Sequence, residues 1–302
     1  MAFDIAFDYR FADGAFFSDE VRNVLKAAAA VWEGRIGEDF DAVPAGVSFT
    51  VRDPGAAGSF APVELATVID DLRIFVGAHT PPFGIGGDDS RALARARVDG
   101  QDVEGDVFAA RVDDNFRRNG PVTDFEPFAG SISFNPDADW GVDPDAAVGG
   151  KLDLFTTALH EIGHVLGLGT APIFRERVGP DGFDGPNAAA ANGGTPIPMT
   201  DAGHHPAAST DTLMAPTLAK GVRTLPQTLD TAMLADIGYA VDGFTATGST
   251  PAVVTDGDDP LVRGTDVADT LDALAGDDHL QGRGGADTLR GGPGDDELLG
   301  QG

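Results

Sequence analysis

The chain contains no cysteine, so a disulfide framework and thiol chemistry are both excluded. Positive charge is also scarce: 20 Lys and Arg residues stand against 49 Asp and Glu residues, a net charge of −29. That balance argues against nucleic acid or an anionic membrane surface as a partner. No apolar run approaches the roughly 18 residues of a membrane-spanning helix, and the N-terminus lacks the basic and apolar regions of a secretory signal. Taken alone, these absences favour a cytoplasmic protein.

The stretch His160-Glu-Ile-Gly-His164 has the form H-E-x-x-H. Residues four apart on a helix lie on one face, about 6 Å apart along the axis. Both imidazoles can therefore reach one metal ion at Zn–N distances of roughly 2.0–2.1 Å. Glu161 stands beside the first ligand, where its carboxylate can meet a metal-bound water without binding the metal itself. The pattern is typical of zinc peptidases, and it predicts a catalytic Glu161 beside the zinc ligands His160 and His164.

The residues around this motif predict a helix. Asp153 is a candidate N-cap, and an apolar stripe recurs at helical spacing behind the histidines. Gly163 suits a helix that packs closely against a neighbour, and Gly167 and Gly169 are expected to end it. The apolar stripe consists of Phe155, Leu159, Ile162 and Leu166.

Outside the motif, the sequence predicts a mixed α+β domain with the cleft below the sheet. Two further helices are expected, one capped by Ser18 or Asp19 and one over residues 229–237. The strand nearest to the motif either forms a sheet edge along which an extended peptide lies or is an ordinary interior strand. Strands are predicted at 3–11, 47–51, 72–76 and 130–134.

A catalytic zinc site needs three protein ligands and an open position. The remaining histidines near the turn at Met214 are His204 and His205, because the others lie in the N-terminal half or in the tail. Glu176 is the only glutamate between the helix and the tail, and it belongs to no helical ligand motif. A glycine before His204 gives the backbone freedom to aim it inward, whereas a proline after His205 restricts that residue. His204 is therefore the preferred third ligand, and His205 is the alternative.

These features resemble the metzincin clan of zinc endopeptidases, in which the helix motif is followed by a glycine turn and a Met-turn. The usual metzincin motif has its third histidine at the position of Thr170 in this chain. Leishmanolysin-like metzincins insert a long segment before that histidine, and the chain resembles bacterial proteins of this type. The matching segments are Gly185-Pro-Asn187, Gly203-His204, Leu213-Met214 and Ala235–Tyr239.

The resemblance implies a metzincin-like catalytic domain over residues 1–242, with a mixed sheet, the active-site helix and the Met-turn. Its expected subdomains are 1–167 and 168–242. It also implies hydrolysis of protein or peptide substrates by a zinc-activated water with Glu161 as general base. Met214 is expected beneath the metal as an apolar floor. Pro216 stands where some metzincins carry a zinc-binding tyrosine, so no tyrosine switch is expected.

A nine-residue repeat occupies residues 258–302, after a linker at 243–257 that is rich in Thr, Gly, Ser and Pro. In such repeats glycines form turns whose carbonyls face calcium, aspartates supply negative charge and leucines fill the interior. The pattern predicts a short parallel β-roll that binds calcium. The aspartates in register are Asp269, Asp278, Asp287 and Asp296, and the leucines are Leu271, Leu280, Leu289 and Leu298.

The tail resembles the RTX-type calcium-binding repeats of bacterial proteins exported by a one-step (type I) secretion system. Such proteins lack an N-terminal signal and are often free of cysteine, so the resemblance implies a secreted, extracellular protein. The secretion signal that usually follows the repeats is missing before Gly302, which leaves a truncation open. The sequence therefore predicts a secreted, monomeric zinc endopeptidase. The competing hypothesis is a calcium-dependent surface or adhesive protein with an inactive metallopeptidase fold.

Overall fold

The computed structural model describes residues 3–12, 15–37, 40, 42–56, 58–82, 93–99, 125–244, 262–263, 270–282 and 287–300. Asp269 and nearly all of the linker expected at 243–257 lie outside these residues. Within the described ranges, every helix is too short or too polar to cross a membrane.

A four-stranded mixed sheet forms the centre of the N-terminal part, with the strand order β1-β4-β6-β5. The strands β1 (Ile5–Phe11), β4 (Leu72–Ala78) and β6 (Ala129–Phe134) are parallel, and β5 (Ala94–Asp99) pairs antiparallel with β6. Every residue of β6 is buried. The strand before the motif is β6, and of the two roles considered for it, the interior role is the one found. The edge beside the active-site helix is formed by β5.

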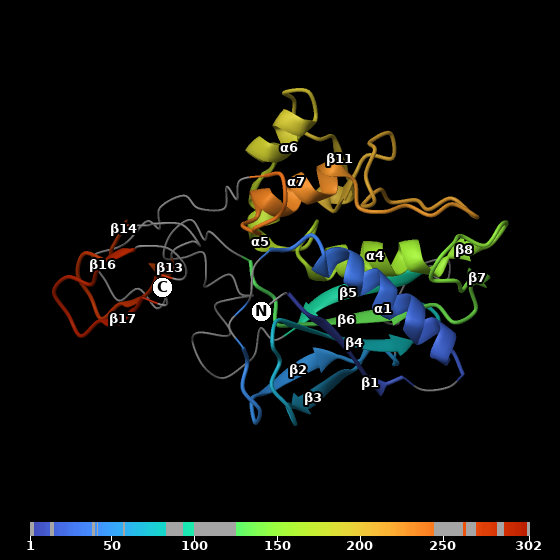
Figure 1. Ribbon diagram of the computed structural model, residues 1–302, viewed down its shortest axis with the longest axis horizontal. Helices are drawn as coiled ribbons and strands as arrows, with labels where there is room; N and C mark the ends of the chain where they lie inside the picture. The colour runs from blue at the N-terminus through green and yellow to red at the C-terminus, as the bar shows by residue number, and fades with distance from the viewer. Residues whose placement is uncertain are drawn as a thin grey trace.

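The helices α1 (Asp19–Glu33) and α4 (Leu154–Val165) cover one face of the sheet (Figure 1). On the opposite face lies the hairpin of β2 (Ser48–Arg52) and β3 (Phe60–Glu64). The hairpin packs Phe49 and Val51 against Phe75 of β4 and Phe128 in a second apolar cluster. The sheet is therefore covered on both faces, and β1 and β5 form its two edges.

Of the two N-caps considered for α1, Ser18 is the one found, and the N-cap predicted at Asp153 is confirmed. The Ser18 hydroxyl accepts a hydrogen bond from the Val21 N–H at 3.4 Å, and the Asp153 carboxylate accepts one from the Thr156 N–H at 3.1 Å. Such caps satisfy backbone donors that have no partner inside the helix. The apolar stripe predicted behind the motif histidines is also buried. The buried residues of α1 are Val21, Val24, Leu25, Ala28, Ala29 and Trp32.

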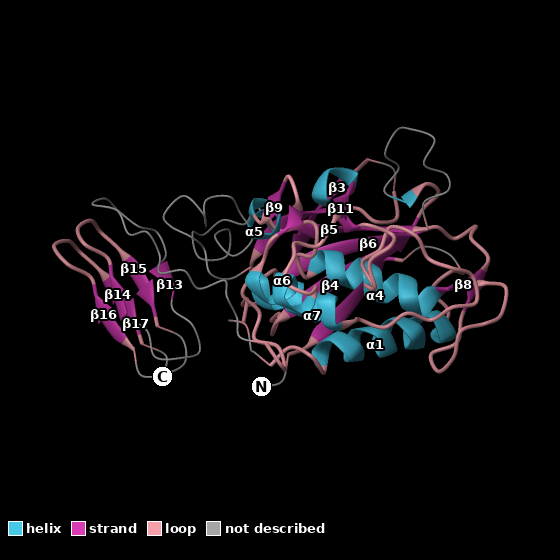
Figure 2. Cartoon of the chain, turned by 90° about the horizontal axis from the view of Figure 1, so that it is seen from above, coloured by secondary structure: helices cyan, strands magenta, loops and turns pink. Residues whose placement is uncertain are grey.

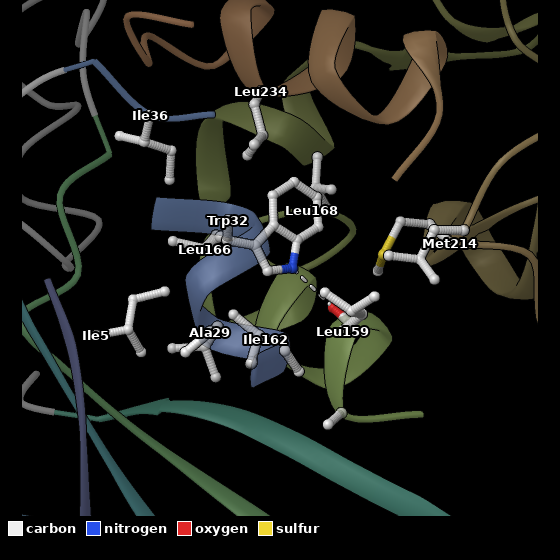
Figure 3. Packing of buried hydrophobic residues seen from close by; sticks show 14 of the residues in the cluster. Ile5, Ala29, Trp32, Ile36, Leu159, Ile162, Leu166, Leu168, Met214 and Leu234 are labelled. Carbon is white, nitrogen blue, oxygen red and sulfur yellow. Dashed lines mark hydrogen bonds between the residues drawn. The ribbon is translucent and has the colours of Figure 1, made fainter. Parts of the chain in front are cut away.

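Trp32 joins α1 to the active-site helix. Its ring is fully buried, and its indole N–H donates to the Leu159 carbonyl of α4 at 3.0 Å (Figure 3). Ile162 and Leu166 of α4 belong to the same cluster. Truncation of such a residue to alanine typically costs about 3–5 kcal/mol. Trp32 thus fixes the helix that carries the metal-binding motif.

The C-terminal part, after α4, consists of short elements that end in α7 (Thr228–Asp236). Figure 2 shows α6 (Pro186–Ala191) beside α7. The Asp236 carboxylate accepts hydrogen bonds from the backbone N–H groups of Asn187 and Ala188, which joins these two helices. The other short elements after α4 are α5 (Pro172–Glu176), β9 (Val178–Gly179), β10 (Gly182–Phe183), β11 (Met199–Thr200), the 3₁₀ helix Asp201–Gly203 and β12 (His205–Pro206). Two short strands, β7 (Trp140–Gly141) and β8 (Leu152–Asp153), precede α4.

The described repeat residues form parallel strands with partners eighteen residues apart. Leu271 pairs with Leu289, and Leu280 pairs with Leu298. Two nine-residue units therefore separate each strand from its neighbour. Leu271 and Leu280 are buried, whereas Leu298 in the last strand is 46% exposed. The strands are β13 (Val262–Arg263), β14 (Thr270–Asp272), β15 (His279–Gln281), β16 (Thr288–Arg290) and β17 (Glu297–Leu299).

Candidate metal centre

The active-site helix places His160, Glu161 and His164 on its cleft side, and all three side chains are buried. A bidentate ion pair supports the start of this helix, because the Arg223 guanidinium donates to both oxygens of Asp153 at 3.0 and 2.9 Å. The predicted helix and the predicted positions of its three polar side chains agree with this arrangement.

Each of three histidine rings has its Nδ1 held by an oxygen acceptor. The Nδ1 atoms of His160 and His164 lie 3.0 and 2.7 Å from the carbonyl oxygens of Leu213 and Leu168. The Nδ1 of His205 lies 3.0 Å from a carboxylate oxygen of Asp201. An acceptor at Nδ1 places the ring proton there and leaves Nε2 as the bare donor atom for a metal.

These three histidines offer ligand nitrogens that all lie within 4.8 Å of one another. The Nε2 atoms of His164 and His205 are 3.3 Å apart. Two nitrogens bound to one zinc ion at 2.0–2.1 Å with tetrahedral angles lie roughly 3.3–3.4 Å apart. The donor set, its spacing and its outer acceptors therefore fit zinc.

The structure differs from the sequence prediction in the third member of this set, since it gathers His205 and not the preferred His204. The Nδ1 of His204 lies 3.0 Å from the Gly169 carbonyl oxygen, and its ring stacks on the face of the His164 ring at a centroid distance of 4.4 Å. A ring stacked in this way presents its face to its neighbour, whereas a shared metal needs ring nitrogens that converge. His204 instead belongs to the packing around the end of α4.

The backbone ahead of these histidines explains the difference. Asp201, Ala202 and Gly203 have φ angles of 51°, 56° and 89°, all in the left-handed region. Three consecutive left-handed residues turn the chain just before His204, so the directions of the two histidines do not follow from the alternation of an extended segment. Gly169, with a φ of 75°, permits the close approach, because a Cβ there would clash with the His204 carbonyl.

Burial controls the charge of the site. It lowers the pKa of His160 to about 4 and that of His164 well below its ordinary value, so both rings are neutral at pH 7. Burial also lowers the pKa of His205, and neighbouring His204 adds to that effect. Burial raises the pKa of Glu161 to about 8, against the charge of Arg95 and a hydrogen bond from the Ala96 backbone. The three rings and Glu161 thus carry little charge at pH 7 before a cation enters.

Met214 packs against α4 at Gly163. A Cβ at Gly163 would lie 2.7 Å from the Met214 sulfur, so the methionine occupies the space left by this glycine. The Met214 turn is held by Asp230 of α7, which accepts hydrogen bonds from the N–H groups of Leu213 and Met214 at 2.8 and 3.2 Å. Since the Leu213 carbonyl holds His160, this buried aspartate supports a candidate metal ligand through one residue.

A cleft of about 710 Å³ opens over the three histidines and Glu161. The edge strand β5 lines one side, and residues 215–218 after the Met214 turn line another. The sequence analysis missed β5 as a strand. Its Ala-Arg-Ala-Arg-Val-Asp sequence carries charged and small residues in place of large apolar ones, so only its two-residue alternation could have indicated it.

The described repeat aspartates lie over glycine turns. A Cβ at Gly282 would lie 2.6 Å from a carboxylate oxygen of Asp287, and one at Gly291 would clash with Asp296. The N–H of Asp278 donates to the Asp296 carboxylate, eighteen residues away, at 3.1 Å. The Asp287 and Asp296 carboxylates thus lie beside glycine backbones, and carboxylate and carbonyl oxygens are the ligands that calcium prefers.

Comparison with known families gives two matches. Residues 112–172 match the family described as Matrixin (Peptidase_M10), and residues 263–298 match the family described as RTX calcium-binding nonapeptide repeat, in 4 copies. No curated protein matches the chain. The two matches support a metzincin-like metallopeptidase with RTX calcium-binding repeats, and they imply zinc and calcium as cofactors. The matrixin match ends before the segment that carries His205. RTX repeats are typical of secreted proteins.

Proposed function

We propose that this protein is a secreted zinc endopeptidase of the leishmanolysin-like type. The observation that carries the proposal is the convergence of three Nε2-presenting histidines beside a buried glutamate, in a cleft bounded by an exposed strand edge. The proposed zinc ligands are His160, His164 and His205. The proposed catalytic domain spans 1–242, and protein or peptide chains are its substrates.

Zinc, when bound, supplies a Lewis acid that polarises the scissile carbonyl and lowers the pKa of water. Glu161 supplies the proton transfers: its carboxylate accepts a proton from the attacking water and then donates it to the leaving amine nitrogen. The Ala96 backbone hydrogen bond orients that carboxylate. The outer edge of β5 offers main-chain groups to an extended substrate, which positions the scissile bond over Glu161.

The repeats complete the proposal. Their parallel strands, eighteen-residue register and carboxylates beside glycine backbones support a calcium-binding β-roll over 258–302. Coupling of this folding to millimolar calcium fits export through a type I secretion system, because folding would be completed outside the cell.

The test is hydrolysis of a denatured protein substrate by the zinc- and calcium-loaded full chain. The wild type is expected to cleave it, and Glu161→Gln is expected to retain zinc but lose at least about a hundredfold in rate. Glu64→Gln, on the exposed face of β3, is the matched control and should match the wild type. Zinc-loaded wild type without hydrolysis would refute the peptidase and favour the adhesive alternative.

A further inference from the structure

Positive charge gathers in the cleft of a chain that is otherwise strongly acidic. Arg95 and Arg97 of β5 and Arg175 of α5 all line the cleft. The carboxylates in its described lining are Glu161 and Asp201, and Asp201 bonds to the His205 ring. The cleft is therefore cationic before any metal is counted, whereas the whole chain has a net charge of −29.

Two of these arginines are available to a ligand. The side chains of Arg97 and Arg175 are exposed. Within the ranges that the structure describes, neither forms an ion pair with a carboxylate, whereas Arg10 and Arg223, for example, pair with Asp8 and Asp153. Partial burial lowers the pKa of Arg97, and the positive charges of Arg52, Arg95 and Arg175 lower it further, whereas the negative charge of Asp99 raises it. Like charges held together in this way attract an anion.

The position of the pair relative to the catalytic carboxylate follows from the strand. The backbone of Ala96 in β5 hydrogen-bonds to Glu161, so the carboxylate lies beside Ala96. Arg97 is the next residue toward the C-terminal end of the strand. A peptide that adds antiparallel to an edge strand runs in the opposite direction. The C-terminal end of β5 therefore faces the part of the substrate on the amino side of the scissile bond.

We propose that Arg97 and Arg175 form a subsite for an acidic substrate side chain on the amino side of the scissile bond. A guanidinium pairs with a carboxylate through charge-assisted hydrogen bonds, which select for Asp or Glu over their amides. This inference rests on the peptidase function proposed above. It identifies the substrates as acidic protein segments.

The first experiment maps every bond that the zinc- and calcium-loaded full chain cleaves in a mixture of unfolded proteins, by mass spectrometry. Asp and Glu are expected to be enriched within about three residues on the amino side of the cleaved bonds, which is the reach of an extended strand segment beside the edge. Enrichment only on the carboxyl side, or no enrichment of acidic residues, would overturn the inference while leaving the peptidase intact. Absence of cleavage would refute the peptidase itself, and the subsite with it.

The second experiment uses two fluorogenic peptides built on a mapped site, one with Glu and one with Gln at the enriched position. The ratio of their kcat/KM values is measured for each variant. Arg97→Gln with Arg175→Gln is expected to lower the Glu/Gln ratio about tenfold, and 1 M salt to lower the wild-type ratio as well. Arg73→Gln removes a guanidinium from β4, outside the cleft lining, and should leave the ratio unchanged. An unchanged ratio in the double variant would refute the assignment.

Discussion

Glu161→Gln is expected to stabilise the zinc-free fold while it removes activity. The folded-state pKa of Glu161 is about 8, raised by burial from the ordinary value of 4.5. A carboxyl group whose pKa is raised by folding binds more protons in the folded state than in the unfolded state. It therefore lowers the free energy of unfolding increasingly as pH rises from 4.5 to 8. Glutamine has nearly the same shape, remains neutral throughout and can still accept the Ala96 hydrogen bond.

The magnitude follows from that difference. Each pH unit above 4.5 costs the folded protein about 1.36 kcal/mol because Glu161 stays protonated there. At pH 7 the raised pKa of Glu161 therefore lowers the free energy of unfolding by about 3 kcal/mol. In a domain of this size, such a gain raises the melting temperature by roughly 6–12 °C. The gain should disappear near pH 4.5, where the carboxyl group is neutral in both states. Zinc should reverse much of it, because a nearby cation favours the ionised carboxylate.

The assay is thermal unfolding between pH 4.5 and 8, after zinc is removed by a chelator that spares calcium. Glu64→Gln, in which an exposed carboxylate is neutralised, is the control and should follow the wild type. If Glu161→Gln and the wild type have parallel pH profiles, then Glu161 is not desolvated in the folded protein, and the low charge of the site described above is refuted.

Three further predictions concern the surroundings of the site. Gly163→Ala should destabilise the protein by about 1–3 kcal/mol in urea unfolding, because its Cβ meets the Met214 sulfur; unchanged stability would contradict this packing. Asp230→Asn should weaken zinc affinity about 10–100-fold in chelator competition, by loosening the Leu213 carbonyl that orients a ligand; wild-type affinity would exclude that role. Millimolar calcium should increase the β-sheet circular dichroism of the full chain, and Asp287→Asn should reduce the increase; equal spectra with and without calcium would count against the β-roll.

The parts of the fold that could be predicted from sequence are those set by local pattern. The active-site helix has a cap at Asp153 and an apolar stripe at helical spacing, and both features are found. The close neighbour expected at Gly163 is also present, and it is Met214. The identity of that neighbour could be expected only through the family resemblance, because nothing local links residues 163 and 214.

The edge strand and the third histidine show where local pattern fails. Strand β5 owes its place to pairing with β6 and not to apolar alternation, so its small and charged residues gave a weak signal. The choice between His204 and His205 depends on the left-handed turn at 201–203. Non-glycine residues such as Asp201 and Ala202 rarely adopt that conformation, and tertiary contacts must impose it.

The acceptors that hold the histidine rings come from distant positions in the chain. The Leu213 carbonyl lies 53 residues from His160, and its position depends on Asp230 of a later helix. Such contacts decide which ring nitrogen is bare, and they cannot be derived from ligand spacing. Site chemistry was therefore predictable from residue types, whereas the ligand set required the folded chain.

Zinc content together with zinc-edge X-ray absorption of two histidine variants tests the central claim most directly. The wild type should bind one zinc ion in the catalytic domain with three imidazole nitrogens at about 2.0–2.1 Å. His205→Ala should lose the metal, or keep it with only two imidazole ligands. His204→Ala should retain one zinc ion with three imidazoles. Loss of an imidazole ligand in His204→Ala and its retention in His205→Ala would contradict the proposed site.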